Sequence, residues 1–598
     1  MTRTFSTAAF VVAAATLTLA GCVSDHDAPS VRKADPPSTT IGATTTSEAP
    51  VPGTTTPPSP DTPTSPKPAR FSALGSTRLR FFAECPDLLS YMQTEALARV
   101  TAWGLGGGPF YGYGGYGGRG GPFPMMETAA AGTAAPAADA AGSAPAGAGG
   151  PDFSGTNTQE VGVDEGDIVE TDGTHVYVAS QDGVRIVDVA SAQVTAKLDV
   201  PDGTHQLLLD GTRLLIATQP YSGVDTIVSL YDVTDPSSPT LVHSSHLEGY
   251  LVATRAVDGT ARLVLTTSLA SRLTFVHPDQ FGLDEDSALV QNKAIIMKST
   301  VDDWMPRSFD VASDGTFGDM STTLDCATVA APSEFAGLGI SWIASVDMHG
   351  SGQPIGAAGI VSNSDIVYAS TTNIYLATVP WDWNQPQTDV APNPTPPPTL
   401  IHEFALGADG SASYVASGEV PGQLLNQFSM SEYNGDLRVA TTTNGVAAPD
   451  VSTSAVRVLR PEGNELKQIG VVDGLGTTEQ IHSVRFLGTQ GYVVTFRQTD
   501  PLYVIDLSDP TAPVVTGELK IPGYSAYLHP VGDGLLLGVG QDATDDGRTQ
   551  GTQLSLFDVH DPANPVRLSS LPIGGWTEAE WDHHAFLFWP EDGTIVLP

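Results

Sequence analysis

Two copies of one short motif near the C-terminus restrict what this chain can fold into more than any other feature. Residues 502–513 read LYVIDLSDPTAP, and residues 554–565 read LSLFDVHDPANP. In each copy an alternating apolar run, typical of a half-buried strand, meets a turn that prolines stiffen and that aspartate can hydrogen-bond. Asp509 and Asp561 are 52 residues apart, in the range of a four-stranded propeller blade, which takes about 40 to 50 residues. Residues 229–239, SLYDVTDPSSP, are an earlier copy.

Hairpin patterns recur through the rest of the chain. A strand pattern, a short turn and a second strand pattern occur in eight segments: residues 157–180, 205–218, 249–267, 366–378, 428–442, 484–496, 526–540 and 583–598. We therefore predict an all-β fold, a β-propeller of eight blades, with seven as the alternative. The long interval 268–358 contains either an insertion or a degenerate blade. The eighth hairpin lacks outer strands, so either a strand near Leu79 completes the ring or the recorded chain is short.

The N-terminus predicts export. Residues 1–21 contain Arg3 and a short apolar run, a signal peptide rather than a membrane-spanning helix. Leu19-Ala-Gly-Cys22 resembles the lipobox of bacterial lipoproteins, which implies that Cys22 is lipidated and becomes the mature N-terminus. The alternative is an ordinary secretory signal with a chance cysteine. Residues 22–70, rich in Pro, Thr and Ser, are expected to form a disordered tether, so the protein is expected on the extracytoplasmic face of the cell membrane.

A strand and a helix are expected at residues 71–103, docked on the propeller. The helix is predicted from Pro86 to Trp103, because apolar residues recur there at helical spacing. With Cys22 lipidated, Cys85 and Cys326 are the remaining cysteines, and an exported protein more often bridges such a pair. We predict a disulfide between them; two buried thiols are the alternative. Residues 104–150, rich in Gly and Ala, are interpreted as a low-complexity loop, and residues 151–598 as the propeller.

Acidic residues dominate the charge of the chain. The sequence has 67 acidic and 27 basic side chains and a formal net charge of −40. Such a surface repels phosphate backbones, which argues against nucleic acid as a partner. The partners expected instead are the membrane, through the lipid anchor, and an unknown protein or carbohydrate ligand.

Two clusters are candidates for metal or ligand binding. The first contains Asp164, Glu165, Asp167, Glu170 and Asp172 with interleaved glycines. Oxygen-rich loops suit Ca²⁺, but the spacing does not match an EF-hand, and turn carboxylates with hydrogen-bond partners are the alternative. The second cluster contains the histidines of two successive hairpins and an adjacent aspartate: His529, Asp582, His583 and His584. Structural histidines are the alternative there, since a metal site needs converging ligands. Asp164, Asp167, His529 and His583 are the candidate ligands.

Several longer motifs resemble a known family. These motifs are residues 157–169, NTQEVGVDEGDIV; 418–433; 483–486; 521–530; and 581–588, WDHHAFLF. They are similar to motifs of secreted bacterial and archaeal proteins with a C-terminal β-propeller domain, described as distantly related to WD40 repeats. The resemblance implies a propeller and an exported protein. It implies no activity and no catalytic residues.

Function is therefore expected from the architecture and not from a catalytic motif. The sequence contains no Gly-x-Ser-x-Gly motif, and no carboxylate pair stands out from the acidic background. The leading hypothesis is a membrane-anchored extracytoplasmic binding or scaffold module, and enzyme activity is not expected. The alternative is a hydrolase or metal-dependent enzyme at the mouth of the propeller channel. Convergence of the four candidate ligands in the channel would favour the enzyme.

Overall fold

The computed structural model describes residues 65–105, 153, 155 and 157–598, with gaps at 76–77, 224, 268–271, 279–281, 313–315, 322–323, 381–397, 444–450, 498–499 and 545–546. The predicted signal peptide, Cys22 and nearly all of the predicted tether lie outside the described residues. So does most of the Gly- and Ala-rich stretch.

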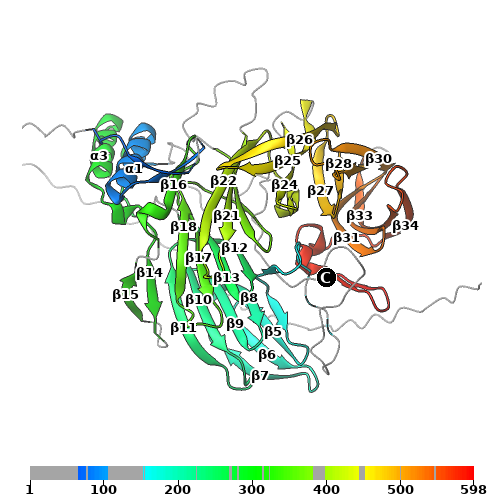
Figure 1. The fold of residues 1–598 in the computed structure, drawn as a ribbon. Helices are drawn as coiled ribbons and strands as arrows, with labels where there is room; N and C mark the ends of the chain where they lie inside the picture. Colours follow the sequence, from blue (N-terminus) through cyan, green and yellow to red (C-terminus); the bar gives the residue numbers. More distant parts are fainter. Residues whose placement is uncertain are drawn as a thin grey trace, which may run out of the picture. The chain divides into compact units, whose positions relative to one another are not determined.

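Four-stranded antiparallel blades make up most of the described chain (Figure 1). The first three are β4–β7 (Val169–Thr171, His175–Ser180, Gly183–Asp188, Gln193–Leu198), β8–β11 (Gly203–Asp210, Arg213–Pro220, Thr226–Asp232, Thr240–Leu247) and β12, β13, β17 and β18 (Tyr250–Val257, Thr260–Thr266, Ser341–Asp347, Pro354–Ile360). The fourth and fifth are β19–β22 (Ile366–Ala369, Asn373–Thr378, Thr399–Leu406, Ala412–Val420) and β23–β26 (Met430–Tyr433, Asp436–Thr443, Thr453–Glu462, Glu465–Leu475). The sixth and seventh are β27–β30 (Gln480–Leu487, Gln490–Phe496, Asp500–Asp506, Val514–Ile521) and β31–β34 (Tyr524–Gly532, Leu535–Ala543, Thr549–Asp558, Val566–Pro572).

All eight predicted hairpins are present among the described residues. Seven of them form the two inner strands of a blade, and the eighth is a two-stranded sheet of β35 (Leu587–Trp589) and β36 (Thr594–Val596). The fold is therefore mostly sheet, as predicted. Each blade buries its alternating apolar residues against the next blade, as in the cluster that joins Val458 of the fifth blade to Val493 and Ile505 of the sixth.

The repeated motif forms the turn that its sequence predicts. β29 ends at Asp506, and the Oδ1 atom of Asp509 accepts a hydrogen bond from the backbone N–H of Thr511 at 3.0 Å. In the next blade Asp561 accepts one from Ala563 at 3.1 Å. The aspartate thus satisfies a backbone donor that the turn leaves free.

The described residues of the long interval after β13 form an insertion and no hidden blade. It holds the helix α3 (Glu285–Lys298), the strands β14 (Ser308–Val311) and β15 (Phe317–Ser321), which extend the second blade, and β16 (Val329–Pro332). β16 pairs with both β18 and β2 (Leu79–Phe82), and β1 (Phe71–Gly75) pairs with β2. The strand near Leu79 therefore extends the outer edge of the third blade. The suggestion that it completes the last hairpin was wrong, because its ladder partner is Ala330 and its neighbours.

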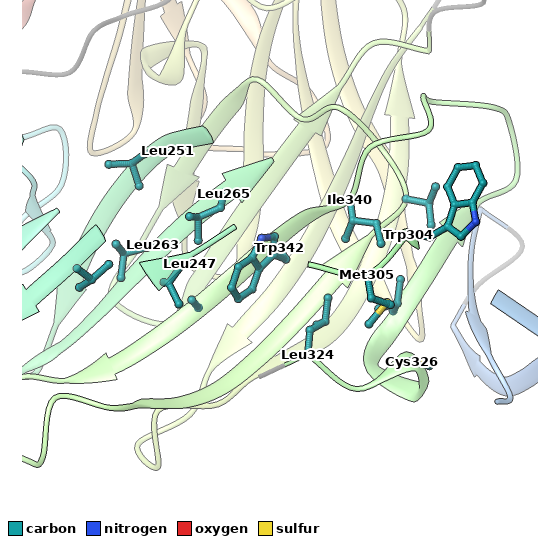
Figure 2. Close-up of a cluster of buried hydrophobic side chains, with 14 of the residues drawn as sticks. Leu247, Leu251, Leu263, Leu265, Trp304, Met305, Leu324, Cys326, Ile340 and Trp342 are labelled. Carbon is teal, nitrogen blue, oxygen red and sulfur yellow. The ribbon is translucent and has the colours of Figure 1, made fainter. Parts of the chain in front are cut away.

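The helix α1 (Cys85–Arg99) packs on this insertion. Pro86 lies at its first turn, where a missing N–H costs nothing. Its buried side chains Leu88, Met92 and Ala96 belong to the same apolar cluster as Trp304 and Trp342. Figure 2 shows part of this cluster, in which Met305, Leu324 and Cys326 are drawn with the two tryptophans. The helix thus covers apolar surface of the insertion and of β2.

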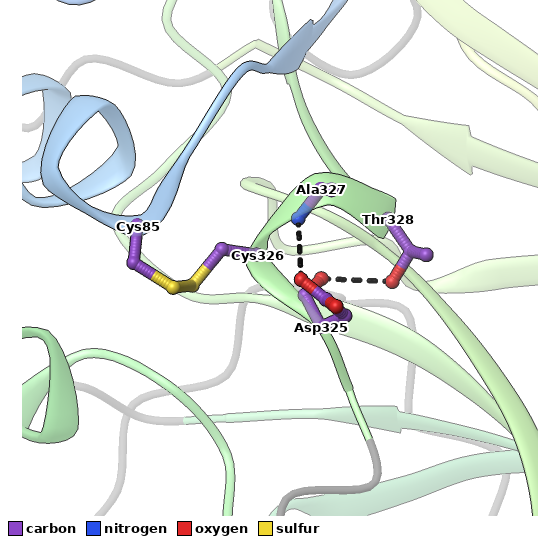
Figure 3. Close-up of a disulfide and its surroundings, with 5 residues drawn as sticks. All are labelled: Cys85, Asp325, Cys326, Ala327 and Thr328. Atoms are coloured by element: carbon purple, nitrogen blue, oxygen red, sulfur yellow. Dashed lines mark hydrogen bonds between the residues drawn. A yellow bond between two sulfur atoms is a disulfide. The ribbon is translucent and has the colours of Figure 1, made fainter.

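A disulfide joins the start of α1 to the insertion. Cys85 and Cys326 are bonded, with their Cα atoms 5.1 Å apart, and they lie 241 positions apart in sequence (Figure 3). Cys326 begins a short 3₁₀ turn that Asp325 caps, since its Oδ1 atom accepts a hydrogen bond from the backbone N–H of Ala327. The structure therefore contains the bridge expected from the cysteine count.

Candidate functional site

A short stretch before the first blade contacts each of the six blades that follow the first. We call residues 157–167 the central segment. Within it, β3 (Asp164–Glu165) pairs with the innermost strand of the third blade at Arg255 and Ala256. Asp167 exchanges two backbone hydrogen bonds, of 2.8 and 2.5 Å, with Leu207 on the innermost strand of the second blade.

The remaining contacts of the central segment lead to the other four blades. Its side chains bond to Tyr368 of the fourth blade, Met430 of the fifth and Tyr527 of the seventh, and its backbone to Arg485 of the sixth. All of these partners lie on the first strand of their blade. Because first strands line the channel of a propeller, the central segment occupies the place where the chain's own channel would be.

Glu165 is the most connected residue of the central segment. Its side chain is buried, and its Oε2 atom accepts a hydrogen bond from the Gln427 side chain at 2.9 Å, while Oε1 accepts one from the Gln159 backbone at 3.1 Å. A guanidinium nitrogen of Arg255 lies 3.5 Å from Oε2 and donates to Gln427 at 2.5 Å. Two strands and a 3₁₀ turn therefore meet at one carboxylate.

Two histidines reach the same carboxylate from the C-terminal end. They lie on a 3₁₀ turn, His583–Ala585, that Asp582 caps, because its Oδ1 atom accepts from the His584 backbone at 3.0 Å. The Nε2 atoms of His583 and His584 each lie 3.5 Å from Oε2 of Glu165. The ring of His583 also meets the edge of Phe428 at 4.7 Å. The cap thus turns both imidazoles toward Glu165.

The charges of this group depend on one another. Burial alone would raise the pKa of Glu165, but Arg255 and the two histidines hold it well below its usual range. Burial and the neighbouring His584 lower the pKa of His583 to about 4. Burial would also lower the pKa of His584, but the carboxylates of Asp582 and Glu165 raise it to about 9. At neutral pH the proton is therefore held by His584.

The other carboxylates of the acidic cluster are buried beside Glu165. Burial raises the pKa of Asp164 to about 8 and that of Asp167 to about 7, and it raises the pKa of Glu170 well above its usual range. Asp172 is different: its Oδ1 atom accepts hydrogen bonds from the backbone of Thr174 and of His175, as expected for a turn carboxylate.

The structure brings together only part of the predicted ligand set. His583 belongs to the group around Glu165, whereas His529 bonds to the Tyr527 hydroxyl at 3.0 Å and packs on Phe586. Asp164 and Asp167 lie beside Glu165 in sequence but take part in the pairing of the central segment with β12 and β8. Among the described residues, the histidine and acidic side chains whose ligand atoms converge are Glu165, His583 and His584.

Sequence reasoning left Glu165, His584, Arg255 and Gln427 out of the candidate set. Glu165 is one of five acidic residues in nine positions, so spacing alone does not distinguish it. The adjacent pair of histidines after Asp582 was the available signal, since an aspartate cap can turn both side chains to one point.

A second feature is an exposed apolar stretch at the seventh blade. Trp576 is 72% exposed and Trp581 is 45% exposed, and their ring centroids lie 5.4 Å apart. Four further exposed apolar side chains precede them: Val566, Leu568, Leu571 and Ile573. A hollow of about 20 Å³, lined by Trp581, Tyr527 and His583 among others, lies between this stretch and the Glu165 group. We call residues 566–581 the tryptophan patch.

The sequence model of the family described as the beta propeller domain matches residues 153–598. The chain belongs to this family. An uncharacterized protein of Methanocaldococcus jannaschii is 29% identical over 485 residues, which cover 74% of this chain and 73% of that protein. An uncharacterized protein of Archaeoglobus fulgidus is 43% identical over 201 residues, which cover 33% of this chain and 29% of that protein. Membership of the beta propeller domain family agrees with the blades and supplies no reaction.

Proposed function

We propose that this protein is a lipid-anchored β-propeller on the extracytoplasmic face of the membrane, where it acts as a binding or scaffold module for a protein partner. The tryptophan patch carries the proposal. Monomeric proteins seldom expose apolar side chains in this density, and tryptophan is enriched among the residues that dominate binding energy at protein interfaces. The central segment occupies the propeller axis, so a large ligand is expected on an outer surface.

The disulfide and the N-terminal motif support the proposed location. The Cys85–Cys326 bridge joins residues 241 positions apart, and such structural disulfides persist mainly in oxidising compartments outside the cytoplasm. Among the described residues there is no helix long and apolar enough to cross a membrane. The Leu-Ala-Gly-Cys motif at residues 19–22 supplies the proposed anchor, because two acyl chains hold a protein stably at a bilayer.

The anchor is tested by comparing the wild-type chain with Cys22→Ser in intact bacterial cells fed an alkyne fatty acid. We expect the wild-type protein to carry the label, to sediment with membranes and to be cleaved by protease added outside. The variant should lack the label and leave the membrane fraction. Equal labelling of both proteins, or protection of both from external protease, would contradict the proposed location.

The partner is tested with a photoreactive phenylalanine analogue placed at Trp576 of the anchored protein. The matched control position is Tyr221, which is 61% exposed and lies in a turn of the second blade. Illumination should give a discrete protein adduct at position 576, absent at 221 and lost with Trp581→Ala. The same adducts at both positions, or none at 576, would contradict the proposal. An adduct whose added mass glycosidase removes completely would replace the protein partner with a carbohydrate.

A further inference from the structure

We propose that Glu165, His583 and His584 bind one Zn²⁺ ion, which joins the central segment to the C-terminal turn. Nothing in this inference depends on the lipid anchor or on the tryptophan patch. Glu165 and His583 lie 418 positions apart in sequence and meet in the interior. One carboxylate and two imidazoles form a ligand set that Zn²⁺ uses widely.

The distances match shared coordination better than hydrogen bonding. The Nε2 atoms of both histidines lie 3.5 Å from the same Oε2 atom of Glu165, whereas a charge-assisted N–H···O bond spans about 2.7 to 2.9 Å. Two ligand atoms of a tetrahedral zinc, each about 2.0 to 2.1 Å from the ion, are separated by about 3.3 Å. Neither Nε2 atom has a hydrogen-bond partner, although both are buried. Two buried imidazole nitrogens that lack hydrogen-bond partners and converge on one carboxylate oxygen are the arrangement that a metal ion needs.

The surrounding groups orient the ligands as in other zinc sites. The Nδ1 atom of His584 lies 2.7 Å from Oδ1 of Asp582, and a carboxylate on the far nitrogen of a histidine ligand fixes the ring and its tautomer. Gln427 and the backbone of Gln159 hold Glu165 by hydrogen bonds of 2.9 and 3.1 Å. The ligand atoms are therefore positioned by partners other than the ion.

The donor types select the ion. Two imidazole nitrogens favour Zn²⁺ over Ca²⁺, which takes oxygen ligands.

The test uses the full chain, purified without chelator and analysed for metals by mass spectrometry. We expect one Zn²⁺ per chain. After removal of the ion, Zn²⁺ added alone should bind in competition with a chromophoric chelator and raise the melting temperature. Co²⁺ should give the visible spectrum of a tetrahedral site with nitrogen and oxygen ligands. A chain that retains no zinc and binds none more tightly than the millimolar range would overturn the inference.

Variants separate coordination from folding. Glu165→Gln and His584→Gln should each weaken Zn²⁺ binding at least a hundredfold, and Asp582→Asn should weaken it by about ten- to a hundredfold. The control is His402→Gln, because His402 is fully buried in the fourth blade and outside the group. It should bind Zn²⁺ as the wild type does. Equal loss of zinc in this control and in His584→Gln would overturn the inference. So would wild-type affinity in His584→Gln.

Discussion

The sixth and seventh blades repeat one design, whereas the central segment has no counterpart elsewhere in the described chain. Gly470 in the fifth blade faces the proline turn of the sixth, and Gly517 in the sixth faces the proline turn of the seventh. A Cβ atom at either glycine would lie 2.2 Å from a proline carbonyl oxygen, of Pro510 or Pro562. The fifth and sixth blades and the sixth and seventh blades therefore contact each other in the same way, and each contact joins blades that are consecutive in sequence.

The central segment stabilises the molecule by different means. It contacts partners on six blades through single side chains or short stretches of backbone, and the partner of Glu165 on the C-terminal turn is more than 400 residues away. The blades hold together by many similar apolar contacts, and the central segment by a few polar contacts that are not interchangeable. This difference predicts that one substitution in the central segment lowers the free energy of unfolding more than one substitution at a contact between blades.

The largest expected loss of stability is that of Glu165→Ala. The change leaves Arg255 buried without its carboxylate, and breaking a buried ion pair from one side costs about 3 to 5 kcal/mol. The measurement is the free energy of unfolding in urea, after chelation so that no metal contributes. The control is Glu462→Gln, which removes an exposed partner of Lys467 and should have no measurable effect. Equal stability of the two variants would remove the distinction between segment and blades.

The blades could be predicted from sequence, and the contacts of the central segment could not. Alternating apolar residues and Asp-Gly turns predicted all eight hairpins because these signals are local. The interval 268–358 was ambiguous because α3 and β14–β16 replace the strand pattern there. Glu165 looked like its four acidic neighbours, since its partners Arg255, Gln427 and His583 belong to distant hairpins. A pairing of single residues across hundreds of positions leaves no periodic pattern in one sequence.

The next largest loss of stability is expected from removing the disulfide. Replacing Cys85 and Cys326 with serine frees a loop of about 240 residues in the unfolded chain and should cost about 2 to 5 kcal/mol. The loss should appear first at α1 and the third blade, where the bridge lies, as early proteolysis near Arg99. The sixth and seventh blades should stay resistant. Simultaneous cleavage throughout the chain would show that the bridge stabilises more than its own region.

A change at the contact between blades should be smaller. Gly517→Ala places a methyl group against the backbone of Pro562, and overpacking of this kind costs about 1 to 3 kcal/mol. Gly356→Ala is the matched control, because the nearest atom to its Cβ would lie 3.8 Å away, an ordinary contact. Urea unfolding of both variants measures the difference. A larger loss for Gly517→Ala than for Glu165→Ala would reverse the proposed order.

The smallest effect distinguishes a histidine of the blades from one beside the central segment. Burial lowers the pKa of His402 to about 3, so the folded state stays unprotonated while the unfolded state, with a pKa of about 6.5, takes up a proton on acidification. The contribution of His402 to the free energy of unfolding is fully present above pH 6.5. It falls by about 1 kcal/mol between pH 6.5 and pH 5.5. His402→Gln should flatten that decrease. His584 has the opposite sign, because its pKa is raised, so its contribution is lost as pH rises through about 9.

The central claim is that residues 157–167 are an integral part of the propeller core. Hydrogen exchange of their backbone amides, followed by mass spectrometry on the full chain, tests it directly. The amide of Asp167 is bonded to Leu207 at 2.8 Å, so the account predicts that it exchanges as slowly as the amides of β8 and β12. Exchange within seconds, as fast as in the exposed turn at Tyr221, would contradict the account.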